Sequence, residues 1–146
     1  SARTRPPPTS SGNCQADGIV TPSPTADEIR LAIPAQPEYG RLARVTVAGL
    51  ALRLGFSHTE VEDLRLAVDE GLILLLDGSG HDGEVEALYR LLDDAIEVEL
   101  TANLGRRVPR PSKAAIERFQ TMVADLVDVA VADPAKRTVR FRKARR

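Results

Sequence analysis

Two adjacent carboxylates, Asp69 and Glu70, interrupt the apolar stretch that runs from Ser57 to Gly78. A carboxylate in apolar surroundings can serve as a general base or contact a partner protein, or it can be neutralised by a nearby arginine. All three interpretations are open for Glu70, whereas Asp69 is expected to be a solvated helix charge. Cys14 is the only cysteine and the two histidines lack ligand-like spacing, so the sequence indicates no metal site of that kind.

One long helix is predicted to position this pair. Ser57 followed by Glu60 fits a capping box at its start, and Gly78 is placed to end it. The last turns, residues 72–76, are apolar on every side, so we expect that end to be buried all round or covered by a partner. The face that is buried along the whole helix is predicted from apolar residues at steps of three and four: Val61, Leu64, Val68, Gly71, Leu72 and Leu75.

Two further helices are predicted. One begins at Pro37 and ends at Leu54, and the second covers about residues 112–126. The apolar face of the first consists of Leu42, Val45, Gly49 and Leu52. The inward residues of the second are expected to be Ile116, Phe119, Val123 and Leu126.

Strands are predicted where apolar residues alternate with polar ones. These stretches are residues 28–33, 85–91, 96–100, 127–132 and 139–141, with Asp93-Asp94 as a hairpin turn. The resulting order, β-α-α-β-β-α-β-β, favours a two-layer α/β sandwich. Its sheet is expected to be mixed but mostly antiparallel, with about three helices covering one face.

Length and composition indicate one globular domain of 146 residues with a net charge of -1. We expect a disordered, Pro- and Ser-rich leader over residues 1–27, the folded domain over 28–143 and a basic tail over 144–146. The basic C-terminal end is either solvated or a local site for an anion or an acidic partner. The balanced charge and an aromatic content of only 3% argue against nucleic-acid binding. Because no signal peptide or membrane-spanning run is recognisable, a cytoplasmic protein without membrane association is expected.

Two motifs in the right order carry a resemblance to a known family. The helix sequence ARVTVAGL at residues 43–50 and the sequence DLRLAVDE at residues 63–70 resemble those of RsbW-type anti-sigma factors. These are serine protein kinases with the histidine-kinase-like (GHKL, Bergerat) ATPase fold, and DLRLAVDE is typical of actinobacterial members. The resemblance covers about residues 28–143 and implies that fold for this chain.

The resemblance also implies roles for individual residues of a nucleotide site. Glu70 matches the glutamate thought to act as general base on a target serine. Four residues later the family has an asparagine that holds Mg²⁺, but this chain has Leu74, which offers no oxygen. The aspartate that binds adenine corresponds to Ala102, although the neighbouring Asn103 could replace it if the register shifted by one residue.

The glycine-rich lid of the family is altered as well. Here the segment reads RRVPRPSKAAIERF from residue 106, with two prolines and no glycine, so it cannot offer a cradle of backbone N–H groups to phosphates. Arg106, Arg107 and Arg110 could still attract phosphate as point charges, or they could belong to an ordinary solvated loop. Residues 72–76 could fill the space of a nucleotide, or they could form a partner-binding patch.

Three interpretations of function follow from the resemblance. The first is a degenerate anti-sigma-factor-like regulator that binds a sigma factor or an anti-sigma antagonist, forms a homodimer and needs no cofactor. In that case Arg44, with Arg41 as a second candidate, would contact the partner, although exposed arginines are also common without a role. The second is an active serine kinase that uses ATP and Mg²⁺ with Glu70 and Asn103. The third is a protein that kept the fold and lost both activities.

Overall fold

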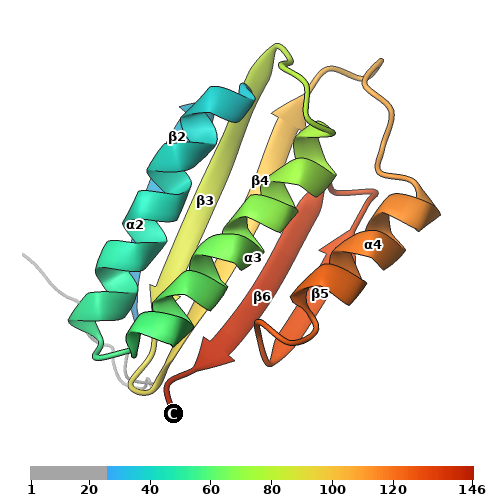
Figure 1. The fold of residues 1–146 in the computed structure, drawn as a ribbon. Coiled ribbons are helices and arrows are strands. Elements are labelled where there is room, and N and C mark those ends of the chain that lie inside the picture. Colours follow the sequence, from blue (N-terminus) through green and yellow to red (C-terminus); the bar gives the residue numbers. More distant parts are fainter. Residues whose placement is uncertain (1–25) are drawn as a thin grey trace, which may run out of the picture.

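The computed structural model describes residues 26–146, and in this part of the chain three α-helices lie on one face of a five-stranded sheet (Figure 1). The order of elements along the chain is the predicted one. Of the expected leader, residues 1–25 lie outside the described residues. No helix within residues 26–146 is both long and apolar enough to cross a lipid bilayer.

The sheet is antiparallel throughout, with the strand order β2-β3-β4-β6-β5. The prediction of a mixed sheet was therefore wrong in that detail, because every neighbouring pair runs in opposite directions. The two-layer α/β architecture is confirmed and agrees with a GHKL-like sandwich. The strands are β2 (Asp27–Pro34), β3 (Gly83–Leu91), β4 (Ala95–Leu104), β5 (Val129–Asp133) and β6 (Thr138–Ala144).

The register separates an apolar face from a charged face. Tyr89 of β3 is aligned with Val98 of β4, which is aligned with Phe141 of β6, and all three are buried under the helices. The next residue of β3, Arg90, points to the other face and forms ion pairs with carboxylates of β2 and β4: Glu28, Glu97 and Glu99. This alternation places the hydrophobic core on the helix side of the sheet.

The central helix, α3 (His58–Leu76), confirms the predicted capping box and the predicted buried face. Ser57 accepts a hydrogen bond from the backbone N–H of Glu60, whose carboxylate in turn accepts one from the backbone N–H of Ser57. The C-terminal turns are buried except at Ile73. The helix ends at Leu76, two residues before Gly78, because Asp77 already adopts the left-handed conformation with φ of 52°.

The predicted orientation of the preceding helix was wrong. A short 3₁₀ turn (Pro37–Tyr39) leads into α2 (Gly40–Arg53), and the four residues expected as its apolar face all point to solvent. The buried face is made instead of small residues and one valine: Gly40, Ala43, Val47 and Ala51.

Close packing explains this orientation of α2. A Cβ atom at Gly40 would lie only 2.9 Å from Leu72 Cδ1 of α3. The Tyr89 hydroxyl donates a hydrogen bond of 2.9 Å to the Ala43 carbonyl, so this face of α2 also lies against the sheet. Larger side chains on it would push the helix away from both neighbours.

The last helix, α4 (Lys113–Val123), begins at the cap residue Ser112 and buries Phe119 and Val123 as predicted. It ends three residues earlier than expected, so Leu126 belongs to the connection to β5. In the helix layer α3 lies between α2 and α4 (Figure 1), which places the C-terminal half of α3 beside the loop that precedes α4.

Candidate functional site

A groove of about 560 Å³ lies between the C-terminal half of α3, the loop over residues 105–112 and the start of α4. This is where the sequence resemblance locates a nucleotide. One wall is formed by α3 and the opposite wall by the loop. The side chains that matter for its chemistry are Leu74, Leu76, His81, Pro109, Arg110 and Arg118.

The α3 wall is apolar and well packed. Leu74 and Leu76 are both almost fully buried, although they line the groove. Leu74 occupies the position that the resemblance assigns to a magnesium-binding asparagine, and its side chain presents only carbon. Near the end of the helix, His81 Nε2 lies 3.0 Å from the Leu76 carbonyl oxygen, so this ring nitrogen already has a partner within the chain.

Glu70 is held in an ion pair across the two helices. Arg118 of α4 donates a hydrogen bond of 2.7 Å to its carboxylate. The Glu70 side chain is only 12% exposed, whereas that of Arg118 is 52% exposed. This pairing corresponds to the interpretation of Glu70 as a carboxylate neutralised by an arginine. Asp69, expected to be a solvated helix charge, has a side chain that is 42% exposed and forms a 3.0 Å ion pair with Arg44.

The loop opposite α3 is fastened by an arginine that sequence reasoning missed. Arg137, in the turn between β5 and β6, is 6% exposed and has a positive φ of 50°. Its guanidinium donates hydrogen bonds to the carbonyls of Val108 and Pro109. Burial lowers the pKa of the Arg137 guanidinium, and the nearby charge of Arg110 lowers it further. Nothing in the local sequence distinguishes this arginine from exposed ones.

The β4 residues at the predicted adenine position do not converge with the rest of the site. Ala102 is buried on the helix side of the sheet, and its N–H donates to the Arg137 carbonyl at 2.9 Å. Asn103 is exposed and aligned with Glu84, and alternation along the strand directs it to the opposite face. Asn103 therefore does not share a surface with Glu70.

The groove lacks two features that the family resemblance assigns to magnesium ATP, an amide at position 74 and a glycine-rich loop. Mg²⁺ prefers oxygen ligands, and within residues 26–146 no group of three or more His, Cys, Asp or Glu side chains could hold a metal ion. Pro109 and Pro111 have no N–H to offer a phosphate. Arg137 holds this loop through the carbonyls of Val108 and Pro109. Arg110 lines the groove, whereas Arg106 and Arg107 are exposed and do not contribute to its lining.

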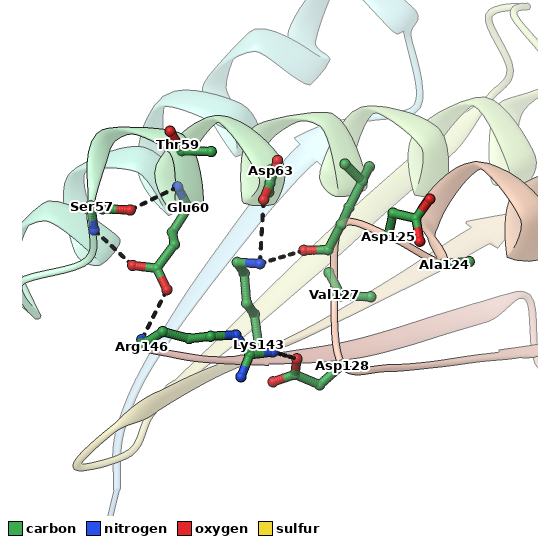
Figure 2. Close-up of a pocket in the computed structure, with 11 residues that line it drawn as sticks. Ser57, Thr59, Glu60, Asp63, Ala124, Asp125, Val127, Asp128, Lys143 and Arg146 are labelled. Atoms are coloured by element: carbon green, nitrogen blue, oxygen red, sulfur yellow. Dashed lines mark hydrogen bonds and ion pairs between the residues drawn. The ribbon is translucent and has the colours of Figure 1, made fainter.

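A second cavity, of about 630 Å³, lies at the opposite end of α3 (Figure 2). The buried ammonium of Lys143 donates 2.7 Å to the Leu126 carbonyl and lies 3.4 Å from Asp63. Glu60 accepts a 2.9 Å hydrogen bond from the backbone N–H of Arg146. These charges neutralise one another within the chain, which indicates a structural role.

The basic segment at residues 144–146 contacts the rest of the domain, although Arg145 and Arg146 are exposed. Ala144 belongs to β6, and the Arg145 guanidinium donates a 2.6 Å hydrogen bond to the Leu54 carbonyl at the end of α2. Arg146 forms an ion pair with Asp128. A cation at the C-terminal end of a helix is favourable, because it interacts with the helix dipole.

The partner-binding candidates lie on α2, away from the sheet. Arg41 is exposed, and Arg44 is 28% exposed and directed along the surface by its ion pair with Asp69. Neither residue lines the groove between α3 and α4. The structure therefore separates the candidates for catalysis from the candidates for partner binding.

Comparison with known proteins gives a partial match. No family model matches the chain. The chain is similar to RsbW serine-protein kinases. It is 38% identical to the Listeria innocua protein over 80 residues, which cover 53% of this chain and 51% of that protein. It is 37% identical to the Bacillus pumilus protein over 79 residues, or 51% of this chain and 49% of that protein. The chain thus spans about half the length of the curated relatives it matches, and over that half the similarity supports the RsbW family.

Proposed function

We propose that this chain is a regulator of the RsbW anti-sigma-factor family that binds a sigma factor, an anti-sigma antagonist or both, without using ATP. The observation that carries the proposal is the composition of the groove beside α3. Leu74 provides no metal ligand, and the facing loop contains two prolines and is bonded to Arg137. A regulator without nucleotide chemistry must act through the proteins that it binds.

The partner surface in this proposal is α2. Arg44 is the residue that the family resemblance assigns to partner contact, and Arg41 is a second candidate on the same helix; Arg41 is exposed and Arg44 is partly exposed. The ion pair with Asp69 limits the freedom of the Arg44 side chain, so less entropy is lost when a partner orders it. A homodimer, a cytoplasmic location and a degenerate actinobacterial-type member of the family belong to the same proposal.

The alternative function is an ATP-dependent serine protein kinase with a rearranged site. The observation in its favour is the groove itself, whose volume falls within the range of small-molecule sites. In this alternative Glu70 would have to leave Arg118 before it could act as a general base. Asn103 would have to be replaced by a ligand from elsewhere, because it lies on the other face of the sheet.

One pair of measurements separates the two functions. The chain is mixed with the sigma factor encoded beside it and analysed by gel filtration with light scattering, with and without Mg·ATP. Separately, Mg·ATP is titrated into the chain in a calorimeter. The proposal expects a stable complex without nucleotide and no saturable heat. Saturable heat, together with phosphate transfer to an antagonist serine that is lost in Glu70→Gln, would establish the kinase instead.

A further inference from the structure

The strand β5 (Val129–Asp133) forms one edge of the sheet (Figure 1). Within residues 26–146 it pairs only with β6, so its other side presents backbone N–H and C=O groups to which a further strand can bond. The sequence VAVAD contains no lysine and no proline, the residues that commonly prevent pairing at the edge of a sheet.

Two valines of β5 are exposed on the open face of the sheet, which is the face opposite the helices. Val129 is 56% exposed and Val131 is 47% exposed. Ala130 lies between them and is aligned with the buried Phe141, so Ala130 points to the helix side and the valines point away from it. β-Branched side chains at an unpaired edge favour the addition of another strand, which would remove them from water.

Two arginines of β6 lie beside these valines on the open face. Arg142 is aligned with Val129 and Arg140 is aligned with Val131, and both arginines are exposed. The edge of the sheet therefore combines an apolar row with a row of positive charges.

The charges of Arg140 and Arg142 are not used within the described part of the chain. On β4 they are aligned with Glu99 and Glu97, respectively. These glutamates lie instead 3.8 Å and 3.0 Å from Arg90 of β3. Among residues 26–146, neither Arg140 nor Arg142 forms an ion pair. A partner with carboxylates would complement these arginines.

Two adjoining hollows follow β5 on this face, with volumes of about 240 Å³ and about 210 Å³. The first is lined by Val129, Val131 and both arginines, and the second by Val131, Asp133 and Arg140 among others. The hollows are thus displaced by two residues of the strand. Alternate side chains of an extended chain point to the same face and are roughly 7 Å apart, which matches this displacement.

We infer that β5 binds an extended acidic segment of a partner protein, which adds a further strand to the sheet. Glutamates of this segment occupy the two hollows, and β-branched residues alternate with them on the helix side. Neighbouring strands are about 4.8 Å apart, so the added strand lies roughly 10 Å from β6. A glutamate and an arginine side chain together span that distance, with the glutamate CH₂ groups against the valines.

This inference goes beyond the proposed function, because β5 belongs neither to α2 nor to the lining of the groove beside α3. It requires no nucleotide and no contact with Arg44. The recognition depends on backbone pairing for affinity and on Arg140 and Arg142 for the choice of an acidic sequence.

The inference is tested with three synthetic peptides of about ten residues. The first alternates valine with glutamate, and the second alternates valine with lysine. The third is the valine–glutamate peptide with proline in place of its central valine, which removes a backbone N–H without changing the charge. Binding to the full chain is measured by fluorescence anisotropy.

The valine–glutamate peptide is expected to bind at least about tenfold more tightly than either of the other two. It should also slow hydrogen exchange over residues 129–133. Equal binding of the proline peptide would mean that charge alone attracts the peptide, and equal binding of the lysine peptide would mean that the arginines select nothing. Either result, or no saturable binding of the valine–glutamate peptide, would overturn the inference.

Substitutions on the sheet supply the second part of the test. The double variant Arg140→Gln, Arg142→Gln is expected to bind the valine–glutamate peptide about tenfold more weakly or worse. The matched control is Arg30→Gln on β2, an exposed arginine at the other edge of the sheet, which should change the affinity by less than about twofold. Thermal unfolding of each variant confirms the fold. Unchanged affinity in the double variant would contradict the inference.

Two further outcomes identify what fails. If light scattering shows a dimer that the valine–glutamate peptide dissociates, a second copy occupies the β5 edge and the inference is wrong. If no sigma factor or antagonist binds, but the peptides behave as expected, the proposed function fails and the assignment of β5 stands.

Discussion

The groove beside α3 and the exposed apolar stripe on α2 (Leu42, Val45, Gly49 and Leu52) both contain leucines. The leucines of the groove are buried, whereas those of the stripe are exposed to solvent. At the groove, Leu74 is buried, and two pairings tie its surroundings together: Glu70 with the lining residue Arg118, and Arg137 with two carbonyls of the lining loop. On α2, Leu42 and Leu52 are exposed beside arginines that face solvent.

This difference shows where the molecule can gain free energy by binding. A ligand in the groove would have to compete with existing hydrogen bonds, and a polar group that loses its partner there costs about 1–3 kcal/mol. A partner on α2 would remove apolar surface from water, which is worth roughly 25 cal/mol per Å². The capacity for new interactions therefore lies on α2.

The largest effect is expected from Leu74→Asn, which restores an amide to the groove wall. Replacement of a buried leucine by a polar residue should lower the free energy of unfolding by about 2–4 kcal/mol. The matched control is Leu52→Asn on the exposed stripe, where only the difference in helix propensity of about 0.5 kcal/mol is expected. Urea denaturation measures both. Equal losses of unfolding free energy in the two variants would contradict the difference between the groove and the stripe. So would Mg·ATP binding by Leu74→Asn in a calorimeter.

The next effect concerns the loop that closes the groove. Arg137→Ala leaves the carbonyls of Val108 and Pro109 without their donor, so we expect a loss of about 1–3 kcal/mol and faster hydrogen exchange over residues 105–112. Arg110→Ala serves as the control, because this exposed side chain makes one 3.3 Å bond to the Ala135 carbonyl. Unchanged exchange in Arg137→Ala would show that other contacts hold the loop.

A smaller effect is expected at the ion pair between α3 and α4. Glu70→Gln removes the charge that faces Arg118, but Arg118 is half exposed and can be solvated instead. The loss should therefore be under about 1 kcal/mol. A double-mutant cycle with Arg118→Met isolates the pair energy. A coupling well above this value would mean that the pair organises the groove and is not a screened surface contact.

The smallest effect is a pH dependence at the other end of α3. The pKa of the Glu60 carboxyl is held below its ordinary value, chiefly because the Ser57 backbone N–H donates a hydrogen bond to it. Since the folded pKa lies below the unfolded one, this group stabilises the fold above about pH 4.3, and the contribution is lost as the pH falls through the folded pKa.

Substitution of Glu60 tests this directly. Glu60→Gln should flatten the decline in melting temperature below about pH 4.3, whereas Glu117→Gln on the exposed side of α4 should not. An identical acid profile for Glu60→Gln and the unchanged chain would show that other carboxylates dominate acid unfolding.

Local signals in the sequence were sufficient for most of the fold. The capping box depends on residues three apart, and the strands depend on alternation between neighbours, so α3 and β3 to β4 follow the predicted patterns. The residue type alone also shows that the side chain at position 74, a leucine, contains no oxygen. These features need no knowledge of which segments meet in space.

The sequence by itself determined the order of elements and the central helix, because each depends on residue types within a few positions. Only the tertiary structure decided which side of α2 is buried. That helix carries apolar residues on two faces, and close packing against α3 and the sheet selects the one with small side chains. The same holds for the partner of Glu70, which lies 48 residues away, and for Arg137, whose burial depends on the loop that it holds.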